Sequence, residues 1–201
     1  MADAKSIADA KPVANERAEI GAASPLFSSQ AEALRATAPL GRVLDLASGR
    51  GRHALAAAAL GLNVLAIDQN AESLASLARA ATATAGKVLG RIETQTIDLE
   101  TGAPPDLPDE QFGAILVFRY LHRPLMPWIA SRLREGGLLL YETFTTEQRS
   151  LGWGPKSDDF LLQPGELSSL FPELETEHSE EGPTEAPRPA ITARLVARRA
   201  R

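Results

Sequence analysis

The chain contains no cysteine, and this absence excludes disulfide bonds, cysteine nucleophiles and cysteine-ligated metal sites. It also contains no apolar run long enough to cross a bilayer. The first residues, Met1-Ala-Asp-Ala-Lys5, lack a basic segment followed by an apolar core, so no signal peptide is expected. These absences predict a cytoplasmic protein with no metal site and no membrane partner.

An excess of positive charge is missing as well. The formal net charge of the chain is -5, which argues against broad affinity for nucleic acid. The basic residues between 194 and 201 are expected to be a solvated strand end and not a nucleic-acid patch. With 201 residues and a hydrophobic share of 44%, the chain fits one globular domain with a full core.

The pattern of apolar residues divides the chain into an arm and one α/β domain. Residues 1–24 are rich in alanine and charge and have no clear apolar stripe, so a mobile arm is expected there. In residues 25–201 strands and helices alternate, which predicts a doubly wound sheet with helices on both faces. The expected strands are 43–47, 63–67, 92–97, 112–118, 138–144 (after a turn at 135–137), 174–178 and 190–197. The expected helices are 30–38, 52–60, 70–86, 126–133 and 164–170.

A glycine-rich turn after the first expected strand carries the strongest functional signal. Gly49 and Gly51 lie between an apolar strand and a helix. Glycines let the backbone approach a ligand closely, and the N–H groups that open a helix favour an anionic group. The next strand ends in Asp68, where a carboxylate can accept hydrogen bonds from ribose hydroxyls. This order of elements predicts a nucleotide-type cofactor site.

Two classes of nucleotide compete for this site. Residues 49–54 satisfy the loose G-x-G-x-x-G/A fingerprint of dinucleotide sites. Asp45 counts against a dinucleotide, because a buried carboxylate within a strand is costly unless it is paired. The ammonium group of S-adenosylmethionine would give Asp45 a partner; alternatively, Asp45 only ties down the glycine loop by accepting backbone N–H bonds. A further acid, Asp98, follows the third strand and either binds the cofactor or begins a turn.

Taken together, these motifs resemble those of class I S-adenosylmethionine-dependent methyltransferases. The matching segments are Asp45-Leu-Ala-Ser-Gly-Arg-Gly51, Asp68, Asp98-Leu99 and Glu135-Gly-Gly-Leu138. The resemblance implies a mostly parallel seven-stranded sheet, a Rossmann-like methyltransferase fold, whose last strand is antiparallel. Ala47-Ser48 replaces the usual glycine-cysteine, and we interpret it as a variant because small residues preserve the turn.

Three further segments narrow the resemblance to a bacterial group of tellurite-resistance-type methyltransferases. They are Arg119-Tyr-Leu-His-Arg-Pro124, Tyr141-Glu-Thr-Phe144 and Asp159-Phe-Leu-Leu-Gln-Pro-Gly-Glu166. Under this resemblance the domain divides into a cofactor half, about residues 40–120, and an acceptor half, about residues 121–201.

The resemblance also implies roles for individual residues. Asp45 would lie near the methionine end of the cofactor, Asp68 would bind the ribose hydroxyls, and Asp98 would bind the adenine amino group. Phe118 or Arg119 would face the transferred methyl group. The implied cofactor-binding residues are Asp45, Ala47, Gly49, Gly51, Asp68, Gln69, Asp98, Leu99 and Phe118.

The segment after the fourth expected strand supplies the candidate acceptor-binding and catalytic residues. Arg119, His122 and Arg123 are suited to hold an anionic acceptor, with Tyr120 and Tyr141 packed beside it or hydrogen-bonded to it. The catalytic candidates are Arg119, Tyr120 and His122, with His122 as a base because imidazole titrates near neutrality. The substrate-binding candidates are Arg119, His122, Arg123 and Tyr141. Alternatively, Arg123 pairs with Glu142 or Asp159, and His122 caps the next helix.

The sequence therefore predicts an enzyme that transfers a methyl group from S-adenosylmethionine to a small-molecule acceptor by in-line displacement. The alternatives are a non-catalytic module that binds S-adenosylmethionine and an NAD-type oxidoreductase. A monomer or homodimer without a nucleic-acid partner is expected. The loop 145–162, which contains Trp153, is either a lid over the acceptor or an ordered loop that packs on the sheet edge.

Overall fold

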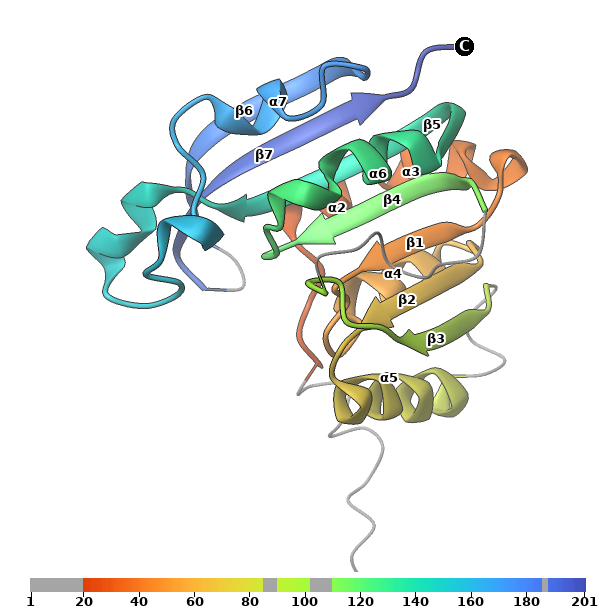
Figure 1. Ribbon diagram of the computed structural model, residues 1–201. Helices are drawn as coiled ribbons and strands as arrows, with labels where there is room; N and C mark the ends of the chain where they lie inside the picture. The colour runs from red at the N-terminus through yellow and green to blue at the C-terminus, as the bar shows by residue number, and fades with distance from the viewer. Residues whose placement is uncertain (1–19, 85–89, 102–109, 186–187) are drawn as a thin grey trace, which may run out of the picture.

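The computed structural model describes residues 20–84, 90–101, 110–185 and 188–201. Seven strands form one sheet in the order β3-β2-β1-β4-β5-β7-β6 (Figure 1). β1 to β5 pair in parallel, and β7 is antiparallel to both of its neighbours. The predicted mostly parallel seven-stranded sheet, whose last strand in the chain is antiparallel, is thus confirmed. The strands are β1 Val43–Leu46, β2 Val64–Asp68, β3 Ile92–Thr96, β4 Phe112–Phe118, β5 Leu133–Phe144, β6 Glu175–Thr184 and β7 Ala190–Arg198.

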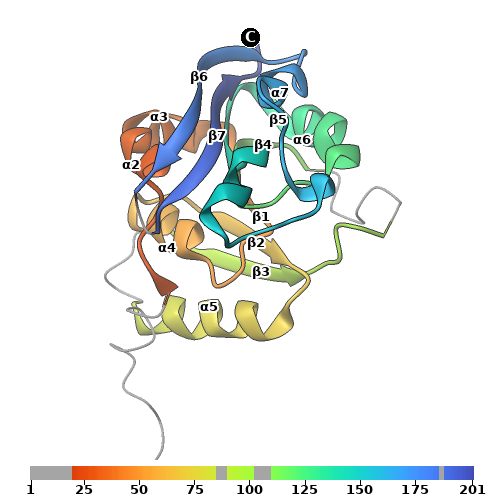
Figure 2. The same cartoon turned by 90° about the vertical axis from the view of Figure 1, so that its left-hand side faces the viewer.

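Helices cover both faces of this sheet. In Figure 2, α2, α3 and α4 lie on one side of the sheet, and α6 and α7 lie on the other. None of the described helices is both long and apolar enough to cross a membrane. The α-helices in the described segments are α2 Pro25–Ser29, α3 Ala31–Ala36, α4 Arg52–Ala59, α5 Ala71–Ala83, α6 Met126–Arg132 and α7 Glu166–Ser169. Short 3-10 turns are η1 Ala38–Leu40, η2 Arg123–Leu125, η3 Thr146–Leu151 and η4 Asp158–Phe160.

Alternate residues of the central strands belong to two separate cores. In β4, Ala114 and Leu116 pack with the core under α4 and α5, whereas Ile115 and Val117 pack with the core under α6. Successive side chains of a strand point to opposite faces, so a strand buried on both faces must be apolar throughout. This requirement explains why the boundaries of β4 agree with the prediction from its unbroken apolar run.

Two strand boundaries were predicted wrongly. The expected turn at 135–137 lies inside β5, because Gly136 adopts a φ of +75° and lets the strand bend without ending. The register with β4 shifts there, between Phe112 and Ala114. β6 was predicted to end at residue 178 but continues to Thr184. Its polar sequence has no alternation of apolar and polar residues, so no pattern marks the end of the strand. Pairing with β7 extends it to Thr184.

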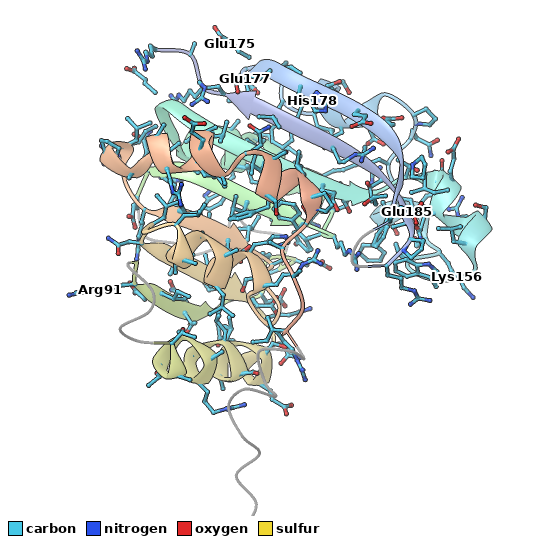
Figure 3. All side chains as sticks on the ribbon, turned by 180° about the vertical axis from the view of Figure 1, so that it is seen from behind. Arg91, Lys156, Glu175, Glu177, His178 and Glu185 are labelled. Carbon is cyan, nitrogen blue, oxygen red and sulfur yellow. The ribbon has the colours of Figure 1, made fainter. Side chains whose placement is uncertain are left out.

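The outer edge of the sheet carries charge. Glu175, Glu177 and His178 are exposed along β6 (Figure 3). Glu177 forms an ion pair with Arg198 of β7, with an N–O distance of 2.5 Å. Charged side chains on an edge strand oppose pairing with the edge of another sheet.

Most of the arm predicted for residues 1–24 lies outside the described residues, but its last part is packed. Ile20 and Ser24 are buried, and the backbone N–H of Ser24 donates a hydrogen bond to His53. The hydroxyl of Ser24 caps α2 by accepting from the N–H of Phe27, with Pro25 at the first helical position. Residues 20–24 therefore belong to the packed domain.

Candidate cofactor and acceptor site

The glycine loop lies at the carboxyl ends of β1 and β2, where the strand order reverses between β1 and β4. Such switch points bind ligands in open α/β sheets. Gly51 has a φ of +75°, and a Cβ added there would overlap the side chain of Leu77 in α5. Ala47 also has a positive φ, 53°. The loop is attached to β2 by a hydrogen bond from the N–H of Ser48 to the carbonyl of Ile67, at 2.8 Å.

Two cavities meet at this loop. The first, of about 220 Å³, lies beside the ends of β1 and β2 and the segments that follow β3 and β4. Its lining consists of Ala47, Asp68, Gln69, Ile97, Asp98, Leu99, Glu100, Arg119 and Tyr120. The second, of about 290 Å³, is lined by Ile20, Asp45, Ala47, Ser48, Gly49, Arg50, Gly51, Arg52, His53, Phe118 and Arg119. Ala47 and Arg119 line both cavities, so we describe the two cavities as one site.

The structure brings all nine predicted cofactor-binding residues to this site. Five of them line the first cavity: Ala47, Asp68, Gln69, Asp98 and Leu99. The other four, together with Ala47, line the second: Asp45, Gly49, Gly51 and Phe118. Taken together, the two cavities fall within the size range of small-molecule sites, about 300–1,000 Å³.

The acids of the first cavity have backbone partners. Asp68 accepts a hydrogen bond from the N–H of Gly49 at 2.7 Å and another from the N–H of Asn70 at 2.8 Å. A carboxylate offers about four acceptor positions, so Asp68 retains capacity for hydroxyl donors in the cavity. Asp98 accepts from the N–H of Glu100 at 2.9 Å, which is the turn-forming bond considered from the sequence. Asp98 therefore forms the turn and also lines the cavity.

Asp45 is buried, with 1% of its surface exposed. Its carboxylate accepts from the N–H of Ala54, at 2.9 Å, so the backbone bond comes from the first turn of α4 and not from the glycine loop. Burial raises the pKa of Asp45 to about 7, although the Ala54 hydrogen bond and the nearby charge of Arg52 oppose this rise. A carboxyl group with such a pKa is suited to a cationic partner in the second cavity.

Arg119 occupies the junction of the two cavities in a strained backbone conformation. Its φ is +60°, and its N–H donates to the carbonyl of Glu142 at 2.7 Å. The guanidinium lies 5.7 Å from the centre of the Phe144 ring and 5.8 Å from that of Trp153. Its Nε is buried and has no hydrogen-bond partner among the described residues. A strained residue with a buried, unpaired donor at a cavity wall is typical of a ligand-binding position.

Of the other acceptor candidates, only Tyr120 lines the site. Burial raises its pKa, and the carboxylates of Glu100 and Asp98 raise it further, so its phenol stays protonated at neutral pH. Tyr141 is fully buried, and its hydroxyl donates to the carbonyl of Tyr120 at 2.9 Å. His122 lines neither cavity and stands at the start of η2, where its side chain makes no capping hydrogen bond.

Arg123 is engaged within the protein. Its guanidinium forms a bidentate ion pair with Glu166, at 2.5 and 2.9 Å, and not with the suggested Glu142 or the carboxylate of Asp159. Its remaining N–H groups donate to the backbone carbonyls of residues 158, 159 and 161. An arginine has five N–H donors, and these contacts use all of them. Arg123 therefore holds the end of the 145–162 loop in place.

A family model described as "Tellurite resistance protein TehB" matches residues 20–139. The chain belongs to this family. This finding confirms the predicted similarity to class I methyltransferases of the tellurite-resistance type. No curated protein matched the chain in a sequence search.

Solved structures resemble this TehB-family chain in fold. The crystal structure of TehB from Haemophilus influenzae has a TM-score of 0.64 and 20% identity, over 84% of this chain and 62% of that one. The chain thus spans less than two thirds of the length of that relative. N-methyltransferase NodS from Bradyrhizobium japonicum WM9 has a TM-score of 0.60 and 14% identity, covering 88% and 98%. Magnesium protoporphyrin IX methyltransferase (ChlM) from Synechocystis PCC 6803, with bound SAH, has a TM-score of 0.62 and 15% identity, covering 87% and 81%.

The 145–162 loop of this TehB-family chain is closed and packed. A bridge between Thr145 and Leu162 joins its ends. The buried side chain of Gln148 donates to the carbonyl of Trp153 at 3.0 Å and accepts from the N–H of Ile191 at 2.8 Å. The Trp153 ring packs edge-on against Phe144, with a centroid distance of 5.6 Å. The loop is thus ordered and packed on Phe144 of β5, and its role as a lid stays a prediction.

Sequence reasoning did not single out two buried polar residues, one beside the site and one in its wall. Glu142 is buried in β5, and burial raises its pKa while Ser24, Arg52 and Arg119 oppose that rise. His53 is buried at the start of α4 and lines the second cavity. The signal for Glu142 was the one that identified Asp45, a single carboxylate inside an apolar strand. His53 offered no comparable signal, because its main partner lies far away in the sequence.

Proposed function

We propose that this chain transfers a methyl group from S-adenosylmethionine to a small-molecule acceptor. The observation that carries the proposal is the convergence of all nine predicted cofactor-binding residues on two cavities that share Ala47 and Arg119. The family match and the methyltransferase fold of NodS and ChlM support it. We also propose that the protein acts in the cytoplasm, as a monomer or homodimer and without a nucleic-acid partner.

The two cavities suit the two ends of the proposed cofactor. In the first cavity, Asp68 would accept hydrogen bonds from the ribose hydroxyls, and Asp98 would accept one from the adenine amino group. Leu99 would pack against the adenine ring. In the second, the buried carboxyl of Asp45 would face the ammonium group of the methionine part. The transferable methyl would then lie near Ala47 and Arg119, where the cavities meet.

The chain has a limited chemical task in this reaction. When bound, S-adenosylmethionine supplies a methyl group already activated by the sulfonium. Alignment and exclusion of water contribute on the order of 7–11 kcal/mol in favourable cases, so a dedicated base is not required. Arg119 would hold an anionic acceptor through its unpaired Nε, and the protonated phenol of Tyr120 would donate to the same group.

The remaining acceptor candidates do not enter the proposed site. The donors of Arg123 are used by Glu166 and the loop carbonyls, and the hydroxyl of Tyr141 is used by the carbonyl of Tyr120. His122 would have to move to reach either cavity, so its role as a base stays a prediction. The proposed acceptor site therefore consists of Arg119 and Tyr120.

Calorimetric titration with S-adenosylhomocysteine, with NAD as the control, tests the cofactor assignment. Micromolar binding of S-adenosylhomocysteine without binding of NAD is expected, and the reverse would identify an oxidoreductase site. A screen with methyl-labelled S-adenosylmethionine should then yield a methylated product among oxyanions, thiols and small carboxylates. Cofactor binding without transfer to any acceptor would favour the non-catalytic module.

Asp45 predicts a proton release on cofactor binding. Its raised pKa means that the folded protein holds the proton up to about pH 7, and a bound ammonium group would stabilise the ionised form and displace that proton. Near pH 6, binding of S-adenosylhomocysteine should release close to one proton, and at pH 8 it should release almost none. Titrations in buffers with different protonation enthalpies measure this number.

Asp45→Asn is the matched control, because the amide oxygen can still accept from the N–H of Ala54. The variant should show no proton release at either pH. If the wild type and the variant release the same number of protons, Asp45 does not bind the ammonium group of the ligand.

A further inference from the structure

The wall of the second cavity contains a buried histidine that the proposed transfer does not use. His53 stands in the first turn of α4 with 3% of its surface exposed. Its ring stacks on Phe118 with a centroid distance of 3.7 Å and lies 5.8 Å from the ring of Phe27. A titratable group in such an apolar setting requires a hydrogen-bond partner, and that partner indicates the role of the histidine.

That partner is the backbone of the N-terminal segment. The N–H of Ser24 donates to Nε2 of His53 at 3.1 Å. Only a neutral imidazole can accept at this nitrogen, so the ring carries its proton on Nδ1. Burial lowers the pKa of His53 well below its usual range, and the charges of Arg52 and Arg119 lower it further. His53 is therefore a permanent acceptor at neutral pH.

Ser24 is the point at which the N-terminal segment is attached to the domain. It is completely buried, its hydroxyl caps α2, and the same side chain hydrogen-bonds to the carboxyl of Glu142. Figure 2 shows the chain that precedes α2 running past α4. Four residues before Ser24, the buried side chain of Ile20 lines the same cavity as Asp45 and His53.

We propose that His53 is a positioning residue that holds the segment Ile20–Ser24 as one wall of the second cavity, where the methionine part of the cofactor would lie. This inference rests on the proposed function, because the cavity must hold the amino-acid part of the cofactor. Without the His53 acceptor, the N–H of Ser24 would lose its partner in a buried place and the segment would move toward water. Ligands that carry the methionine part would then bind less tightly, and ligands that lack it would be unaffected.

His53→Phe and Ser24→Pro each remove the hydrogen bond from one side. Phenylalanine keeps a ring against Phe118 but offers no acceptor. Proline lacks the N–H and fits the φ of -67° at residue 24. The matched controls are His53→Gln, which restores an acceptor, and Ser24→Ala, which keeps the N–H and removes only the hydroxyl.

The readout is the affinity for S-adenosylhomocysteine compared with that for 5′-methylthioadenosine, which has no amino-acid part. Both test variants should weaken S-adenosylhomocysteine binding about tenfold and change 5′-methylthioadenosine binding less than about twofold. His53→Gln should recover most of the loss. Ser24→Ala should leave the ratio of the two affinities unchanged, although it lowers the unfolding temperature.

Equal weakening of both ligands, or no weakening of either, would overturn the role of His53 while leaving the proposed function intact. A wild-type protein that binds neither ligand would overturn the proposed function and this inference together. If His53→Phe fails to fold, Ser24→Pro measures the same bond from the other side.

Discussion

Asp68→Ala is expected to lower the affinity for S-adenosylhomocysteine by about 100-fold or more. Hydrogen bonds to a charged group contribute about 1.5–3 kcal/mol each, and the variant removes the acceptor of the ribose hydroxyls. It also removes the bond from the N–H of Gly49, which attaches the glycine loop to β2. Calorimetric titration measures the loss directly.

A matched control separates this effect from a general change of charge. Glu72 is an exposed carboxylate in the first turn of α5, close in sequence to Asp68 but outside both cavities. Glu72→Ala should change the affinity less than about twofold. An analogue without ribose hydroxyls should lose much less affinity in Asp68→Ala than S-adenosylhomocysteine does. If Asp68→Ala binds S-adenosylhomocysteine within threefold of the wild type, the ribose assignment is wrong.

Arg119→Met is expected to reduce methyl transfer about 100-fold while it changes the affinity for S-adenosylhomocysteine less than about threefold. The variant keeps most of the side-chain volume beside Phe144 and Trp153 and removes the guanidinium donors that would pair with an anionic acceptor. Methionine and lysine occupy the left-handed backbone region with a cost similar to that of arginine. The comparison therefore isolates the guanidinium.

Initial rates with the acceptor found in the screen, measured beside calorimetric titrations, test this expectation. Arg119→Lys is the control, because it keeps the charge and loses the planar fork. We expect intermediate rates from it. An equal loss of transfer and of cofactor affinity in Arg119→Met would assign Arg119 to the cofactor and not to the acceptor.

The sequence alone was sufficient for the features that depend on local backbone chemistry. Gly49 and Gly51 were identifiable because both adopt a positive φ, which favours glycine, and at Gly51 a Cβ would also overlap Leu77. Asp45 and Asp68 were identifiable because a carboxylate is rare inside or directly after an apolar strand. Parallel strands end at the same edge of a sheet, so the pattern also predicted that these residues converge.

The tertiary structure alone decided which side chains are available to a ligand. Arg123 and Tyr141 have the residue types of an acceptor site, but partners distant in the sequence, Glu166 and the carbonyl of Tyr120, use their donors. His53 acquires its role only because the fold brings it to Ser24, 29 residues away. Hydrophobic periodicity and turn-forming residues indicate the local backbone conformation of the segment that contains them. A hydrogen bond between distant segments depends on the path of the whole chain, and no local pattern encodes that path.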